Sequence, residues 1–334
     1  MRNLYFLLLL GLLLTGLSCG EEMRLVTTTT TTTIPFWKKV PGNFSGCAVG
    51  AFVNGVENLG SFQSLIEKKL AVVLWYVHWF EPFPSAEADL VWNNGSLPLI
   101  TWEPWISWEA VRPLTPLEAI ASGSFESYIR LFLQAAKDWG RPLFLRFAHE
   151  MNGNWYPWDG FHNGSSETGA ENYKRAWIYI HNVREELGAE NVNLVWCPNN
   201  TSLPDEDWNT PEAYYPGDRY VDWIAMDGYN WGNSRWQSFD SVFSDIYRKL
   251  TSLTSKPLMI GEFSSATGEA GDIDKKAAWI TEAFSKIKSN YPRIKIFNWF
   301  NINKERDWRV ESSPDVINAF KISLQNSYYL STIR

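Results

Sequence analysis

Short apolar runs alternate with longer amphipathic segments along most of this 334-residue chain, and this alternation restricts the folds open to it. We expect the apolar runs to be buried strands, and eight of them occur: residues 47–53, 71–79, 97–105, 142–150, 192–199, 221–229, 257–264 and 294–302. Most are apolar along their whole length, which is typical of parallel strands that are covered on both faces.

Segments with helical periodicity separate these runs, at residues 62–70, 124–139, 171–187, 239–253, 273–287 and 314–324. Residues 82–95 and 199–217 look instead like long loops with little helix. Strands that alternate with helices predict an α/β fold, a single (β/α)8 TIM barrel over residues 35–334. An open doubly wound sheet is the alternative, but no G-x-G-x-x-G follows the first run to support a nucleotide site.

Three polar residues lie at the end of the fourth run and just beyond it. They are His149, Glu150 and Asn152, and the loop that follows contains Trp155 and Trp158. A carboxylate at the carboxyl end of a buried strand, close to aromatic rings, is costly to desolvate. Such a carboxylate is a candidate functional group.

A second glutamate, Glu262, follows the first apolar residues of the seventh run, close to its carboxyl end. On a barrel, both glutamates would lie at the carboxyl ends of strands, where the active sites of barrel enzymes are built. Two carboxyl groups about 5 Å apart serve a retaining glycosidase, one as acid/base and one as nucleophile. The alternative for Glu150 is a structural role, with its charge neutralised by Arg146 or by backbone amides.

Aromatic residues are unusually frequent, with 19 Trp, 14 Tyr and 19 Phe making up 16% of the chain. Rings of this kind pack against the apolar faces of sugars, so the content fits a polysaccharide ligand. We expect several residues at the predicted barrel mouth to contact such a ligand: His78, Trp102, Asn152, Trp155 and Trp158.

Three motifs make the chain similar to glycoside hydrolase family 26. They are H-E-M-N-G at residues 149–153, D-G-Y at 227–229 and I-G-E at 260–262. The similarity extends from about residue 36 to the end of the chain. That family consists mainly of secreted endo-β-1,4-mannanases, with some β-1,3-1,4-glucanases and β-1,3-xylanases.

The resemblance implies a role for each matching residue. Glu150 would be the acid/base and Glu262 the nucleophile. His149 would line the −1 subsite, Tyr229 would donate a hydrogen bond to the nucleophile, and Trp299 would form an aromatic floor under the same sugar. For His149, Tyr229 and Trp299, ordinary packing inside a barrel is the alternative.

The sequence motifs indicate the substrate less clearly than they indicate the type of reaction. His149 before the acid/base agrees with the mannanases and the glucanases of the family, whereas the loop N-W-Y-P-W at residues 154–158 departs from the mannanase pattern. We predict internal cleavage of β-1,4-mannan or glucomannan, with β-1,3-1,4-glucan and β-1,3-xylan as alternatives. A non-catalytic carbohydrate-binding lipoprotein is the alternative of another class.

The first 34 residues predict export. A charged Arg2 precedes an apolar stretch too short to span a bilayer, so residues 1–19 are expected to be a signal peptide. Cys19 lies where a lipoprotein signal would place its lipidated cysteine. Residues 20–34, which include seven consecutive threonines, predict an extended linker. The protein is therefore expected to be secreted, either free or lipid-anchored on the outer face of the membrane.

Composition and cysteine spacing exclude other classes. The chain has 37 acidic and 30 basic residues and no basic block that could follow a phosphate backbone, so nucleic acid is not an expected partner. No C-x-x-C or H-x-x-x-H spacing predicts a metal, and no cofactor is expected. Cys47 and Cys197 fall in runs on opposite sides of the barrel and predict buried free thiols. We expect a monomer.

Overall fold

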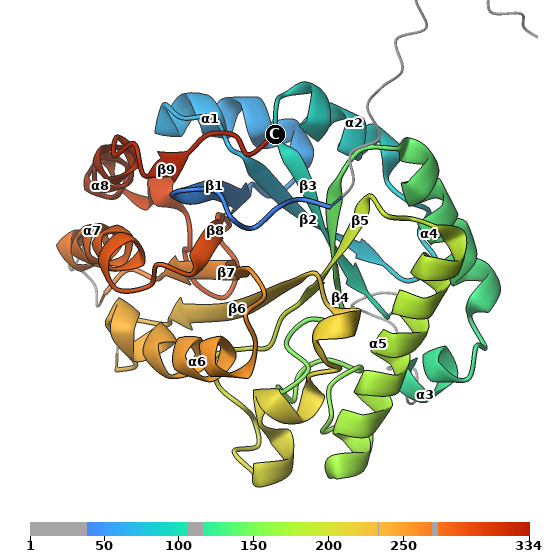
Figure 1. Cartoon of the computed structure of the whole chain (residues 1–334). Helices are drawn as coiled ribbons and strands as arrows, with labels where there is room; N and C mark the ends of the chain where they lie inside the picture. The colour runs from blue at the N-terminus through green and yellow to red at the C-terminus, as the bar shows by residue number, and fades with distance from the viewer. Residues whose placement is uncertain (1–38, 106–115, 233, 269–272) are drawn as a thin grey trace, which may run out of the picture. The chain divides into compact units, whose positions relative to one another are not determined.

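The computed structural model describes residues 39–105, 116–232, 234–268 and 273–334. Strands β1 to β8 pair in chain order, each parallel to the next, and β8 pairs with β1, so the sheet closes into a barrel (Figure 1). Their bounds are β1 Cys47–Phe52, β2 Val72–His78, β3 Leu97–Glu103, β4 Leu143–Phe147, β5 Val192–Trp196, β6 Trp223–Asn230, β7 Leu258–Ser265 and β8 Ile294–Phe300. The short β9, Tyr329–Leu330, also pairs with β1. The predicted (β/α)8 barrel is confirmed.

Helices lie around the barrel (Figure 1). Their bounds are α1 Leu59–Ile66, α2 Ser85–Asn93, α3 Pro116–Ala121, α4 Glu126–Trp139, α5 Glu167–Leu187, α6 Phe239–Leu253, α7 Ile273–Ser289 and α8 Pro314–Leu324. The predicted bounds of α6 and α8 match the structure, and α4 and α7 differ by two residues at one end.

The prediction of little helix in residues 82–95 is wrong, because α2 fills most of this connection. Only Ala88 and Val91 are buried on α2, so its apolar stripe is too narrow to be recognised in the sequence. Residues 199–217 do form a largely non-helical loop, interrupted only by the short 3-10 turns Asp207–Asn209 and Pro211–Tyr214.

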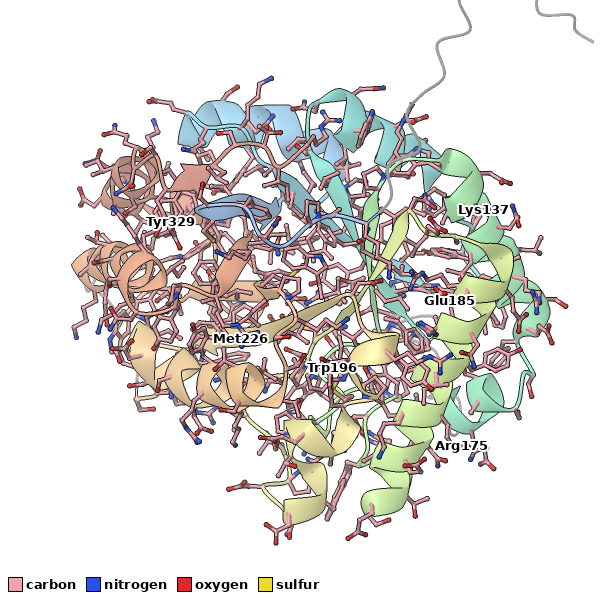
Figure 2. The ribbon with its side chains drawn as sticks, in the orientation of Figure 1. Lys137, Arg175, Glu185, Trp196, Met226 and Tyr329 are labelled. Carbon is pink, nitrogen blue, oxygen red and sulfur yellow. The ribbon has the colours of Figure 1, made fainter. Side chains whose placement is uncertain are left out.

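The core has two layers, separated by the ring of strands, and side chains fill both (Figure 2). Alternate strand residues point into the barrel or outward to the helices. Leu74, Leu99 and Phe144 belong to the inner cluster, whereas Val73, Ile100 and Leu145 belong to the outer one. This alternation decides which residues at the strand ends can reach the barrel mouth.

Cys47 and Cys197 are buried free thiols, as the sequence predicted. No helix in the described ranges is long and apolar enough to cross a membrane. The expected signal peptide, Cys19 and the threonine-rich linker lie outside the described residues.

Candidate active site

Glu150 stands just beyond the end of β4 on an unusual backbone. Ala148 and Glu150 have φ angles of 47° and 54°, in the left-handed region that non-glycine residues rarely adopt. Hydrogen bonds from the amide of Ala148 to the carbonyl of Trp102, 3.1 Å, and from the amide of Glu150 to the carbonyl of Cys197, 2.7 Å, hold this turn. Strained backbone of this kind tends to occur at functional sites.

Glu262 lies on β7 and is only 5% exposed. The Tyr229 hydroxyl donates to its Oε2 at 2.5 Å, and the Tyr76 hydroxyl donates to its Oε1 at 2.5 Å. The Arg146 guanidinium also donates to Oε1. The expected hydrogen bond from Tyr229 to Glu262 is therefore present in the structure.

Arg146 is fully buried and pairs with two carboxylates. Besides Glu262, it contacts both oxygens of Asp227, at 2.8 and 3.0 Å. Its Nε donates to Thr101 Oγ1 at 2.9 Å. These contacts do not fit the alternative in which Arg146 neutralises Glu150, since Arg146 is engaged with Glu262 and Asp227.

A glycine makes this close packing possible. A Cβ added to Gly261 would overlap Oδ1 of Asp227 and lie 2.7 Å from Nη1 of Arg146. The pairing of β7 with β8 is irregular between Ile260 and Phe263, which is the stretch that contains Gly261 and Glu262. An irregularity of this kind re-aims the side chains that follow it.

The two glutamates have opposite electrostatic environments. Burial, together with the negative charges of Asp227 and Glu262, raises the pKa of Glu150 well above its usual range. Burial alone would also raise the pKa of Glu262, but the charge of Arg146 and the hydroxyls of Tyr229 and Tyr76 outweigh it and lower that pKa to about 2. Near neutral pH this arrangement favours a protonated Glu150 and an ionised Glu262, which are the states that an acid and a nucleophile need.

His149 lies beside Glu262, with its Nε2 3.9 Å from Oε1 of Glu262. Burial and the charge of Arg146 lower the pKa of His149 to about 3, so the imidazole is neutral at physiological pH. Its Nδ1 is buried without a hydrogen-bond partner in the described part of the chain. A role for His149 in binding substrate stays a prediction.

Trp155 and His78 lie close to carboxylates of the site. Trp155 is partly exposed, and its Nε1 donates to Glu150 Oε2 at 2.8 Å. His78 Nδ1 lies 3.1 Å from Oε2 of Glu103, which also accepts from Trp105 Nε1 at 3.0 Å. Both His78 and Trp155 are partly exposed, and their contact with a ligand stays a prediction.

The predictions for Trp102 and Trp299 are wrong. Both indoles are fully buried and point outward to the helices: Trp102 stacks on Phe132 of α4 at 4.4 Å, and Trp299 packs against Phe320 of α8 at 5.3 Å. The reason is strand alternation, because each tryptophan is one residue away from the face that reaches the barrel mouth.

Asn152 and Trp158 support the site from behind. Asn152 is 0% exposed, accepts from the amide of Asn199 at 2.8 Å and donates to the carbonyl of the same residue at 3.0 Å. Trp158 is also 0% exposed, donates to the carbonyl of His149 at 2.7 Å and stacks on Tyr156 at 4.2 Å. Neither side chain has exposed surface for a sugar, so their assignment to direct substrate contact is corrected.

Sequence reasoning missed Tyr76, Tyr156 and Trp308. Tyr76 shares the inward face of β2 with His78, two residues on, so strand alternation could have found it. Tyr156 stands between His149 and Trp158 in the aromatic loop. No sequence signal pointed to Trp308, which lies beyond β8 and packs 4.9 Å from Tyr229.

His149, Asp227 and Glu262 place possible metal-binding atoms within 4.8 Å of one another. Arg146 contacts both carboxylates of this group and already supplies a positive charge there. We therefore interpret these three residues and Arg146 as a buried ion-pair network.

We expect Arg146→Met to destabilise the protein by about 3–5 kcal/mol at pH 7, because the substitution leaves two buried carboxylates unpaired. The measurement is urea-induced unfolding. Glu262 has a lowered pKa, so its paired charge stabilises the fold above the pKa of the unfolded chain and this contribution is lost as the pH falls towards 2. The difference between wild type and variant should shrink over that range.

The matched control for Arg146→Met is Arg130→Met. Arg130 on α4 also forms ion pairs with two glutamates, Glu126 and Glu186, but all three side chains are exposed to solvent. Its loss should destabilise the protein far less than the loss of Arg146, because solvent screens exposed ion pairs. Equal effects of the two substitutions would contradict the importance of the buried network.

A parallel eight-stranded barrel with two buried glutamates, one just beyond strand four and one on strand seven, whose surroundings favour a protonated and an ionised carboxyl group, has the fold and site of a two-carboxylate glycosidase. Comparison with known proteins defines the family. The chain belongs to glycosyl hydrolase family 26, whose family model matches residues 125–332.

Individual relatives agree with this membership. Endoglucanase H of Acetivibrio thermocellus is 39% identical over 84% of this chain and 31% of that protein. Mannan endo-1,4-beta-mannosidase A and B of Caldalkalibacillus mannanilyticus is 28% identical over 56% of this chain and 34% of that protein. The chain thus spans about a third of the length of these two relatives. A solved Bacillus subtilis mannanase, 21% identical, covers 86% of this chain and 87% of its own with a TM-score of 0.64, which supports the fold.

Proposed function

We propose that this protein hydrolyses internal bonds of a β-linked glucan or mannan with retention of anomeric configuration. In the first step a Glu262 oxygen attacks the anomeric carbon while Glu150 gives its proton to the departing glycosidic oxygen. In the second step Glu150 takes a proton from water, and that water displaces Glu262. The observation that supports the proposal best is the contrast between the two buried glutamates: Glu262 accepts hydrogen bonds from two tyrosines and an arginine, whereas Glu150 has no cationic partner at ion-pair distance among the described residues, and their pKa values shift in opposite directions accordingly.

The surroundings of the pair suit these roles. The three donors to Glu262, from Tyr229, Tyr76 and Arg146, favour its ionised form before attack. Trp155 is bonded to Glu150 and is partly exposed, so its ring can meet the sugar at the bond to be broken.

We place β-glucan first among the substrates and β-1,4-mannan or glucomannan second. The sequence alone favoured mannan. The 39% identity to a protein named endoglucanase, against 28% to a mannosidase, moves the preference to glucan. The loop at 154–158, which departs from the mannanase pattern, supplies both Trp155 at Glu150 and Tyr156 at His149.

The test is kcat/KM on mixed-linkage β-glucan, linear mannan, glucomannan and β-1,3-xylan. We expect the glucan value to exceed the mannan value at least tenfold, which corresponds to about 1.4 kcal/mol of transition-state preference. A higher value on mannan would reverse the order of the substrates. Binding to these polysaccharides without hydrolysis would support the non-catalytic alternative.

We further propose that the protein works outside the cytoplasm, on the basis of the expected signal peptide at residues 1–19 and the linker at 20–34. Globomycin-sensitive processing and labelling with radioactive palmitate would distinguish lipidation at Cys19 from release as a free protein.

A further inference from the structure

Lys276 on α7 is a buried lysine that the proposed chemistry does not use. The residue is 0% exposed, and its Nζ donates to the carbonyls of Asp307 at 2.8 Å and Arg309 at 2.7 Å. In the described part of the chain, no carboxylate oxygen lies at ion-pair distance from this Nζ. Burying an amino group is costly, and a methionine could fill similar space without that cost. The hydrogen bonds of Lys276 are therefore the feature that requires explanation.

These bonds converge on one short segment after β8. The residue between the two acceptors is Trp308, and its own carbonyl accepts from Ser264 Oγ at 2.8 Å and from Trp299 Nε1 at 3.1 Å. Side chains from β7, α7 and β8 thus hold three consecutive carbonyl groups. A primary amine has at least two N–H donors in either protonation state. Lys276 can therefore donate to both carbonyls whether it is neutral or charged.

The side chain of Trp308 connects this segment to the active site. Its ring lies 4.9 Å from the ring of Tyr229 and 5.3 Å from that of Trp231. Trp308 itself is only 1% exposed, so it acts by packing against its neighbours. Tyr229 in turn donates to Glu262 at 2.5 Å.

We propose that Lys276 is a positioning residue that holds Trp308 against Tyr229 and thereby keeps the Tyr229 hydroxyl on Glu262. This inference rests on the proposed function, because it assigns Glu262 as the nucleophile. It adds a residue of the outer helical layer, remote from the substrate, to the groups on which the reaction depends. Hydrogen-bonded backbone and packed rings form a continuous physical path from Lys276 to Glu262.

The test uses Lys276→Met in the full chain, with Lys288→Met as the matched control on the same helix. Lys288 is exposed and makes one long contact, 3.5 Å, to Asn326. We expect Lys276→Met to lower kcat about tenfold or more with a smaller change in KM, since misplacing a reacting group by about 1 Å can cost 10²-fold. Hydrogen exchange of the 301–313 peptide should accelerate in Lys276→Met alone.

A double-mutant cycle separates positioning from general destabilisation. If Lys276 acts through Tyr229, the loss caused by Lys276→Met should shrink to less than about twofold in a Tyr229→Phe background, because neighbours in one network are not additive. A full tenfold loss in that background would overturn the proposal. So would unchanged exchange at 301–313.

Two further outcomes are distinguishable. If Lys276→Met does not fold, Lys276→Gln replaces it in the cycle, because glutamine keeps an N–H donor. If neither variant folds, Lys276 is needed for folding and the positioning role is overturned. If the wild type hydrolyses none of the β-glycans, the proposed function fails, and the hydrogen-exchange comparison still decides whether Lys276 holds the segment around Trp308.

Discussion

Alanine in place of Glu262 is expected to lower kcat on the preferred β-glycan by on the order of 10⁴-fold or more, because no other group can form the covalent intermediate. The variant should remain folded. Arg146 keeps its two contacts to Asp227 when Glu262 is removed, so the guanidinium is not left unpaired in the barrel. The measurement is steady-state hydrolysis together with thermal unfolding.

The control for this variant is Glu87→Ala, which removes an exposed glutamate on α2. It should leave both kcat and the unfolding temperature unchanged. Residual activity of Glu262→Ala above about a tenth of wild type would reject the nucleophile role, since a lost covalent step cannot leave so much activity. Inversion of the anomeric configuration in wild type, followed by NMR, would reject the double displacement itself.

Glu150→Ala is expected to lower kcat by about 10²–10⁴-fold on polysaccharide, which is the usual contribution of general acid–base catalysis. On an aryl glycoside whose leaving group needs no proton, the first step should be much less affected. Added azide should then restore turnover and yield a glycosyl azide of the same anomeric configuration as the substrate, because azide needs no general base. Absence of this rescue, in a variant that is still folded, would contradict the acid/base role.

The pH profile gives an independent check of Glu150. In wild type, activity requires a protonated Glu150 and an ionised Glu262. Activity should therefore fall as pH rises through the raised pKa of Glu150, and fall on the acid side only towards pH 2, where Glu262 is protonated. In the azide-rescued Glu150→Ala reaction the alkaline fall should disappear. If the loss of activity at alkaline pH persists in this variant, a group other than Glu150 causes it.

The sequence was most informative where local patterns determine structure. Helices α6 and α8 were predicted with their observed bounds from their helical periodicity, and in the structure each begins after a serine whose side chain caps the first turn. Helix α2 was missed because only two of its residues, Ala88 and Val91, are buried. The positions of Glu150 and Glu262 follow from the apolar runs that precede them, and the structure has Glu150 just beyond the end of β4 and Glu262 in the carboxyl-terminal half of β7.

Some of the residues that surround the two glutamates could not be predicted without the tertiary structure. Arg146 was considered as a partner for Glu150, yet the structure pairs it with Asp227 and Glu262. These three residues come from three different strands, so their distances depend on how β4, β6 and β7 are arranged in the barrel. Trp308, for which the sequence carried no signal, was missed for the same reason.

By itself the sequence determined the barrel, its order of strands and the two glutamates at its mouth, because the length and spacing of apolar runs are local properties of the chain. Only the tertiary structure decided which face each strand residue occupies. Both faces of these strands are buried, so the alternation that would mark an inward residue is hidden, and Trp102 and Trp299 were placed on the wrong side. On β7, simple alternation from the outward-facing Ile260 would turn Glu262 towards the helices. The irregular pairing around Gly261 turns it into the barrel, and this irregularity is visible only in the register of β7 against β6 and β8.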